Sequence, residues 1–228
     1  MPSGSVLIGE RFRGPASSGN GGYACGLLAG FVDAPAVEVT LRLPPPLGRP
    51  LAVELEAGRA VLLDDGALVA EGVAAELEAD VPPPVGWEAA SEAAKRYPGL
   101  SEHPFPECFV CGPARRAGDG LRVFAGPVAG RDGLVAAPWR AREVEPAVVW
   151  AAIDCPGAFA AGAVPRGSVL GRMTAAVYRL PAEGEECVSA GWPVGVDGRK
   201  LFAGTALYGA DGQVLAASRQ TWVAPRDP

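Results

Sequence analysis

The residues whose types and spacing could perform chemistry fall in two short segments that lie far apart in the chain. The first segment is "SGNGGYACG", in which Asn20, Gly21 and Gly22 stand directly before an apolar stretch. Glycines leave backbone N–H groups uncovered at a helix start, where the helix dipole favours negative charge. The second is "AAIDCPGAF", in which Asp154 is the one carboxylate of an apolar segment. Together they predict a carboxylate that activates water and amides that stabilise an oxyanion.

Both segments also have simpler interpretations. Asn20 can cap an ordinary helix that follows a flexible loop. Asp154 can cap a helix that resumes at Pro156, because proline is favoured in the first turn of a helix. A buried, unpaired carboxylate is costly unless its pKa rises, and carboxylates perturbed in this way are common at functional sites. We therefore expect Asp154 to act as a general base or nucleophile, which a capping role does not exclude.

A third motif, "ECFVCG", has the Cys-x-x-Cys spacing of metal and redox sites. Zinc would need two more ligands, but the sole histidine, His103, lies five residues before Cys108, and Cys25, Cys155 and Cys187 are far away in sequence. No βαβ pattern surrounds the motif, so a thioredoxin-like role is not favoured. The odd number of cysteines indicates reduced thiols rather than a disulfide framework. We expect no bound metal.

The elements that would position these residues occur twice along the chain. Residues 58–78 and 198–225 both run Gly-Arg, strand, Asp-Gly turn and alternating strand, and Asp-Gly turns are strong hairpin signals. Each copy follows a further strand pair and one apolar helix. We place the strand pairs at 36–57 and 168–194, the helices at 20–33 and 146–162, and a short strand before each helix at 10–13 and 121–135.

A helix that is apolar on nearly every face indicates an antiparallel sheet wrapped around it, which is the hotdog arrangement. We therefore predict an α+β fold, a double hotdog with two tandem units. Residues 1–85 form the N-terminal unit, 86–117 a connector with a short helix at 87–97, and 118–228 the C-terminal unit.

Two segments resemble known families. "SGNGGYACG" resembles the loop-to-helix start of phenylacetate-pathway hotdog thioesterases, which carry His-Gly-Gly at this place. "AAIDCPGAF", followed by "SRQTWV", resembles the C-terminal half of the acyl-CoA thioesterase II family, a double hotdog. That family uses an Asp, a Thr or Ser, and a Gln, which the resemblance assigns to Asp154, Thr174 and Gln220. The simpler interpretation of Thr174 and Gln220 is that they are ordinary strand residues.

The resemblance implies hydrolysis of an acyl thioester at one composite site per chain. Asn20, Gly21 and Gly22 would come from one unit and Asp154 from the other. An acyl chain would run between helix and sheet, and we expect its lining to include Ala24, Leu27 and Ala158.

Arg115 and Arg116, in the glycine-rich "GPARRAGDG", suit the phosphates of coenzyme A, although arginines of this kind are often only a solvated surface. Coenzyme A would be part of the substrate, and no separate cofactor is expected.

Composition narrows the remaining functions. A net charge of −6 with only two lysines makes nucleic-acid binding a poor candidate. No apolar run approaches about 18 residues and no signal-peptide pattern is present, so we expect a cytoplasmic protein without a membrane partner. A homodimer is expected by analogy with hotdog proteins.

Two other functions remain open. One is a protein that binds an acyl chain without catalysis. The other is a hydratase or dehydratase of the same fold, which would normally pair an Asp with a His, whereas the single histidine lies in the connector.

Overall fold

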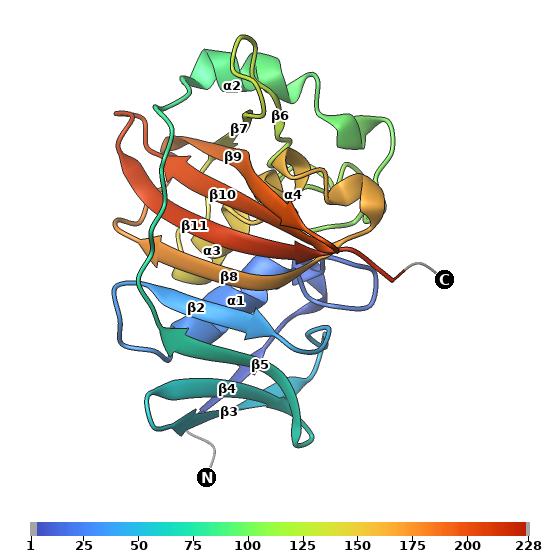
Figure 1. Ribbon diagram of the computed structural model, residues 1–228, viewed down its shortest axis with the longest axis vertical. Coiled ribbons are helices and arrows are strands. Elements are labelled where there is room, and N and C mark those ends of the chain that lie inside the picture. The colour runs from blue at the N-terminus through green and yellow to red at the C-terminus, as the bar shows by residue number, and fades with distance from the viewer. Residues whose placement is uncertain (1–3, 227–228) are drawn as a thin grey trace.

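Eleven antiparallel strands form one strongly curved sheet in the computed structural model, which describes residues 4–226 (Figure 1). Their order across the sheet is β1-β3-β4-β5-β2-β8-β11-β10-β9-β7-β6. The strands are β1 (Gly4–Leu7), β2 (Val37–Leu41), β3 (Pro50–Glu56), β4 (Arg59–Asp64), β5 (Ala67–Ala74), β6 (Gly126–Pro127), β7 (Val135–Arg140), β8 (Val169–Val177), β9 (Glu186–Asp197), β10 (Lys200–Tyr208) and β11 (Val214–Val223).

The strand order is the same on both sides of the central β2–β8 pair. Moving outward from β2 the sheet continues through β5, β4, β3 and β1. Moving outward from β8 it continues through β11, β10, β9 and β7, and the two-residue β6 is added at that edge. The two halves therefore repeat the same connectivity. The strands of 58–78 and 198–225 occupy matching places in the sheet, as their sequences predict.

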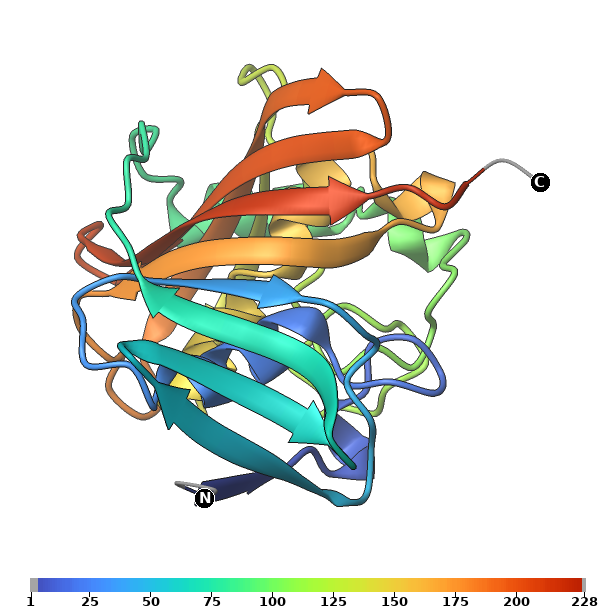
Figure 2. The same cartoon turned by 60° about the horizontal axis from the view of Figure 1, so that its bottom comes forward.

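Helices lie inside the curve of the sheet, as Figure 2 shows. These are α1 (Gly21–Ala29), α3 (Pro146–Ala152) and α4 (Cys155–Ala160). The first, α1, packs against α3 and against β2 and β5, while α4 packs against β9 and β10. The helix α2 (Trp87–Ala94) confirms the helix expected in the connector and packs on β7. Single turns of 3-10 helix occur at Glu10–Phe12, Pro98–Leu100 and Val164–Arg166.

Close packing between α1 and α3 explains two of the glycines in the first segment. A Cβ atom at Gly26 would lie 2.7 Å from the Cα of Ala147, and one at Gly22 would lie 2.5 Å from the Cβ of Asp154. Residues four apart lie on one face of a helix, so this face of α1 has no room for side chains. It is held directly against α3 and the residues that follow it.

The short strands before the helices differ from the sequence prediction. Residues 10–12 form the 3-10 helix, and the strand lies earlier, at β1. In the second half, the two-residue β6 lies within the predicted 121–135, whereas the longer β7 begins only at Val135, where the predicted strand ends. The observed strands lie where they pair in the sheet, β1 with β3 and β7 with β9. No helix within residues 4–226 is long and apolar enough to cross a membrane.

Candidate active site

Asp154 lies at a break between two helices and is almost completely buried, with 1% of its surface exposed. The first helix, α3, ends at Ala152 with Ile153 as its C-cap, and α4 begins at Cys155, so the carboxylate lies where the helical path is interrupted. Its Oδ2 accepts a hydrogen bond of 2.9 Å from the Asn20 side chain and one of 3.1 Å from the Gly22 N–H. The two segments singled out by the sequence therefore meet in space.

Asn20 serves two purposes at the start of α1. Its Oδ1 accepts a hydrogen bond of 2.9 Å from the Tyr23 N–H, which is an ordinary N-cap, and its Nδ2 donates to Asp154. Asp154, by contrast, makes no capping hydrogen bond to α4, although that helix does resume with Pro156 in its first turn. Capping and a role at the site coexist in Asn20, whereas the carboxylate of Asp154 does no capping.

The second carboxylate oxygen of Asp154 has no hydrogen-bond partner. Within residues 4–226, only two buried side-chain polar atoms are unpaired: Oδ1 of Asp154 and Oγ of Ser168. Both residues line the same cavity, of about 550 Å³. Because buried polar atoms are normally paired, two unpaired ones in one cavity indicate a place for a polar group of a ligand.

Burial raises the pKa of Asp154 from its usual value to about 7, while the hydrogen bonds from Gly22 and Asn20 oppose this shift. A carboxyl group with a pKa near neutrality can accept and return a proton efficiently at that pH.

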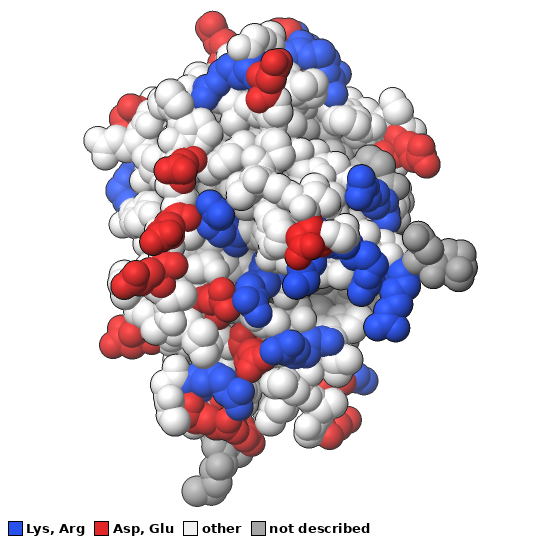
Figure 3. All heavy atoms as spheres, viewed as in Figure 1, with Lys and Arg blue, Asp and Glu red and all other residues white. Residues whose placement is uncertain are grey.

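The cavity combines apolar walls with a few polar groups, and it lies where α1, α4, the start of β8 and the connector meet. Figure 3 shows basic side chains gathered around a hollow beside the end of β2 and the start of β8. Arg42 is the one arginine or lysine among the described residues that line the cavity. The lining also includes Asn20, Gly21, His103, Cys108, Cys111, Cys155, Ala158, Val164, Leu170 and Trp222.

Gln220 does not line the cavity but contacts the residue that precedes Asp154. Its Nε2 donates a hydrogen bond of 2.7 Å to the carbonyl oxygen of Ile153, and its Oε1 accepts one of 2.8 Å from the Trp222 indole. The Thr205 hydroxyl donates to the same carbonyl at 2.7 Å. These bonds fix the peptide that precedes Asp154, so Gln220 and Thr205 are placed to orient the carboxylate.

Thr174 does not reach the site. Its neighbours Met173 and Ala175 belong to the core, and side chains alternate along a strand, so Thr174 lies on the outer face of the sheet. There its hydroxyl donates a hydrogen bond of 3.2 Å to Glu38. The structure therefore does not bring Thr174 together with Asp154. The sequence did not identify two other hydroxyls: that of Thr205, which binds the carbonyl oxygen of Ile153, and that of Ser168, which lines the same cavity as Asp154. The register of β10 turns Thr205 inward.

The two glycine amides are placed differently from expectation. The Gly22 N–H donates to Asp154 and is not free to bind a substrate oxygen. Gly21 lines the cavity, and as the first residue of α1 its N–H has no acceptor inside the helix. No other acceptor for it occurs in the part of the chain that the structure describes. Gly21 therefore remains the candidate donor for a developing oxyanion.

The structure differs from two further predictions, on the residues that line the acyl chain and on the arginines that bind coenzyme A. Of the residues expected along an acyl chain, Ala158 lines the cavity, whereas Ala24 is buried in the core and Leu27 is half-buried away from the lining. Arg115 and Arg116 do not line the cavity either. The three guanidinium nitrogens of Arg115 donate to Glu107, Asp119 and Arg11 within the protein. Coenzyme A recognition by Arg115 is therefore not supported.

The connector is part of the wall of the cavity. Its Cys108 and Cys111 lie beside Cys155, with all three sulfur atoms within 4.8 Å of one another. Hydrogen bonds from the thiols of Cys111 and Cys155, and from the backbone N–H groups of Val110 and Cys111, hold the pKa of Cys108 well below its usual range. His103 contacts this cluster through Nε2, which lies 3.3 Å from the sulfur of Cys111. The sequence alone does not place Cys155 in this cluster, because it lies far from Cys108 and Cys111 along the chain.

No protein-family model and no curated protein matches this sequence. Solved structures do match. A protein described as a thioesterase from Novosphingobium aromaticivorans superposes with a TM-score of 0.64 at 15% identity, covering 97% of this chain and 95% of that one. The acyl-CoA thioesterase II TesB2 of Mycobacterium marinum gives a TM-score of 0.51 at 12% identity, with coverage of 84% and 80%.

The same architecture also occurs in an enzyme of another reaction class. The dehydratase domain of a mycocerosic acid synthase-like polyketide synthase superposes with a TM-score of 0.60 at 14% identity, covering 98% of this chain and 90% of that one. These similarities show that the chain has an α+β hotdog fold. Because one fold hosts several chemistries, the reaction has to be argued from the site.

Proposed function

We propose that this chain is a thioesterase-type hydrolase that cleaves an acyl-CoA thioester at the cavity beside Asp154. The observation that supports this most directly is the state of the Asp154 carboxylate. One oxygen is fixed by Asn20 and Gly22, and the other is buried, unpaired and part of a residue that lines the cavity. A carboxylate held in this way is oriented to act on a molecule in the cavity.

In the proposed reaction, Asp154 acts as a general base. Its Oδ1 accepts a proton from water, and the water oxygen forms a bond to the thioester carbonyl carbon. The carbonyl oxygen becomes an oxyanion, which the N–H of Gly21 and the dipole of α1 stabilise. The carbon–sulfur bond then breaks, and Asp154 returns the proton to the leaving thiolate. The products are a carboxylic acid and a free thiol.

We further propose that the chain consists of two tandem hotdog units, residues 1–85 and 118–228. The matching strand order on the two sides of the β2–β8 pair supports this division. So does the place of one helical segment, α1 or α3–α4, inside each half. In this arrangement the Asn20 segment and Asp154 come from different units, so the chain carries one composite site.

For the coenzyme A part of the substrate, Arg42 is the better candidate than Arg115 or Arg116. It lines the cavity, and 53% of its side chain is exposed, so it can reach phosphates outside the mouth. Glu71 accepts hydrogen bonds from Arg42 and holds it in place. The acyl chain would lie deeper, along apolar residues such as Val164 and Leu170.

The test is hydrolysis of a series of acyl-CoA substrates, from acetyl to long-chain. The rate is measured from the release of the free thiol. We expect the wild type to hydrolyse part of this series. The Asp154→Asn variant should lose at least about 10²-fold in kcat, which is the low end of general-base contributions. It should keep the wild-type fold, because an amide oxygen can still accept the hydrogen bonds from Asn20 and Gly22.

Two results would overturn the proposal in different ways. If Asp154→Asn hydrolyses acyl-CoA as fast as the wild type, Asp154 is not the base. If the wild type hydrolyses no thioester but binds acyl chains in a fluorescence displacement assay, the protein is a non-catalytic acyl-binding hotdog.

A further inference from the structure

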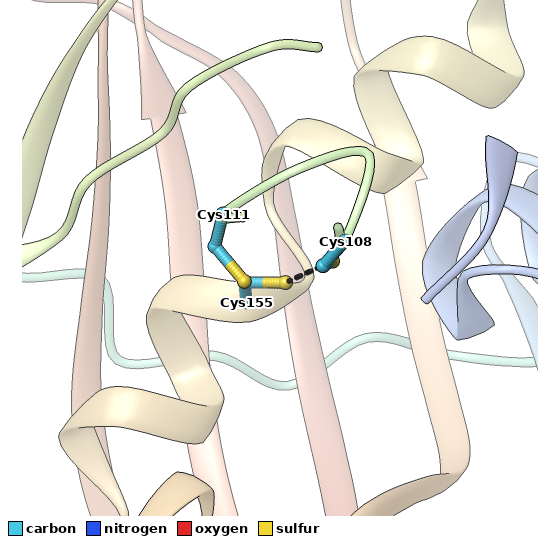
Figure 4. Close-up of side chains that lie close together, drawn as sticks. All are labelled: Cys108, Cys111 and Cys155. Carbon is cyan, nitrogen blue, oxygen red and sulfur yellow. Dashed lines mark hydrogen bonds between the residues drawn. The ribbon is translucent and has the colours of Figure 1, made fainter. Parts of the chain in front are cut away.

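We propose that Cys108, Cys111 and Cys155 bind one zinc ion as thiolates, with a fourth coordination position that opens into the cavity. Figure 4 shows the geometry: Cys108 and Cys111 extend from the connector loop, and Cys155 extends from the first turn of α4 toward them. All three side chains are buried, at 3–5% exposure. The proposal reverses the expectation of no bound metal, which rested on the long sequence separation of Cys155 from the other two.

The distances between the sulfur atoms fit a tetrahedral ion. With Zn–S bonds near 2.3 Å, tetrahedral geometry separates two sulfur ligands by about 3.8 Å. The sulfurs of Cys108 and Cys155 lie 3.9 Å apart. The others lie within 4.8 Å of one another, so a small side-chain rotation would bring all three to one centre. Sites rich in thiolate select thiophilic ions such as zinc.

His103 is placed to support the metal site rather than to bind the ion. The backbone N–H of Phe105 donates a hydrogen bond of 2.9 Å to Nδ1 of His103. A neutral imidazole that accepts at Nδ1 carries its proton on Nε2. This Nε2–H then donates to the sulfur of Cys111, 3.3 Å away. A histidine that donates to a metal-bound thiolate is a positioning residue of the second coordination sphere.

The fourth position would face the cavity because the cavity is lined by all three cysteines. Zinc sites with three protein ligands keep an exchangeable position for water or an added ligand. The ion binds the cysteines as thiolates, so any of the three that is still protonated releases its proton to solvent. Because Cys155 directly follows Asp154 in the chain, the ion would also fix the peptide on which the carboxylate is carried and tie the connector to α4.

The alternative for these thiols is a disulfide. Cys108 and Cys155 are the closest pair, but both are free in the structure. A disulfide would shorten their separation to about 2.05 Å. It would involve neither Cys111 nor the hydrogen bond from His103. The third thiol and the histidine donor therefore favour a metal ion.

The first experiment measures metal content in tag-free protein grown with zinc and purified without chelators or thiol reductants. We expect about one zinc per chain by mass spectrometry. Ser variants at Cys108, Cys111 and Cys155 should lose it. Ser variants at Cys25 and Cys187, which are equally buried but lie outside the cluster, are matched controls and should retain it. Wild type without stoichiometric metal that also takes up no added zinc would overturn the proposal.

A second experiment avoids any folding defect of the variants by using the wild type alone. Replacement of zinc by Co²⁺ should give thiolate-to-cobalt charge-transfer absorption, and addition of a small thiol should change the ligand-field bands if the fourth position is open. Bands that do not respond to the thiol would contradict an open position. Titration of thiols in denaturant and chelator should find five; three would indicate a disulfide and contradict the metal site.

The His103→Ala variant tests whether the histidine positions a metal-bound thiolate or binds the ion itself. As a positioning residue, it should still bind one metal ion, with an affinity about 10- to 100-fold lower in a chelator competition. An unchanged affinity would overturn its assignment. None of these measurements depends on hydrolytic activity, so the metal site and the proposed thioesterase reaction succeed or fail separately.

Discussion

At the scale of single residues, one side chain connects the structure of the helix start to the chemistry of the site. Asn20 is 3% exposed and uses its oxygen to cap α1 and its nitrogen to hold Asp154. A histidine at this place would offer a different set of donors. With Asn20, the hydrogen bond fixes one oxygen of the carboxylate and leaves the other available.

The two purposes of Asn20 can be separated by substitution. Asn20→Ser retains a side-chain oxygen for the cap but removes the donor to Asp154. A hydrogen bond to a charged group contributes about 1.5–3 kcal/mol to stability, so we expect a lower melting temperature. Because the carboxylate is then no longer held in place, we also expect a loss of about 10- to 100-fold in kcat/KM. Thiol-release kinetics and thermal unfolding would measure these.

Thr174→Val is the control for this prediction. It has nearly the same volume, and Thr174 lies on the outer face of the sheet with Glu38 as its partner. We expect activity within about twofold of the wild type. Activity of Asn20→Ser equal to that of Thr174→Val would show that the Asn20 donor is not needed.

At the scale of elements, the contact between α1 and α3 brings the two parts of the site together. From the sequence alone, the glycines in "NGGYACG" indicate exposed amides. In the structure, two of them allow close packing of the helices. Gly22 and Gly26 allow α1 to approach Asp154 and α3 to within van der Waals contact of their backbones. A wider contact would move Asn20 away from Asp154 and break the hydrogen bond between them.

Gly26→Ala tests this packing. The added Cβ would lie 2.7 Å from the Ala147 Cα and 2.8 Å from the Trp150 Cβ. Overpacking of this kind costs about 1–3 kcal/mol, so we expect a lower free energy of unfolding in urea, despite the higher helix propensity of alanine. Gly30→Ala is the matched control, because its Cβ would meet only an ordinary contact, 3.5 Å from the Leu27 carbonyl. Equal stability of the two variants would contradict the packing role.

At the scale of the whole molecule, the two halves share one sheet, and residues of both halves line one cavity. The β2–β8 ladder joins them, with Val37 opposite Ala175 and Thr40 opposite Arg172, and α1 packs on α3. Whether two chains associate further stays a prediction, which size-exclusion chromatography with light scattering would test.

This shared core predicts that neither half is stable alone. A fragment of residues 1–85 would expose the apolar face of α1 and the edge of β2. We expect it to show no cooperative urea transition by circular dichroism, whereas the full chain unfolds cooperatively. Co-expression of residues 1–85 with residues 86–228 should restore the transition. A cooperative transition in the 1–85 fragment alone would show that the first unit has a core of its own.

The sequence by itself determined the features that depend on local order. Asp-Gly turns fixed hairpins, as at Asp65 and Gly66, whose φ angles of 48° and 84° suit a tight turn. The repeated strand pattern predicted the sheet, and the isolated carboxylate of Asp154 and the Asn20 cap marked the site. Each of these follows from neighbouring residues, because turns, caps and apolar periodicity are local properties.

Only the tertiary structure decided which distant groups meet. Strand register turned Thr174 outward and Thr205 inward, since a shift of one residue exchanges the faces of a strand. The approach of the connector to α4 placed Cys155 beside Cys108 across 47 positions of sequence. Because α1 packs against α3, the Gly22 N–H donates a hydrogen bond to Asp154 and is not available to a substrate. These outcomes depend on packing between segments, and no local pattern in the chain specifies them.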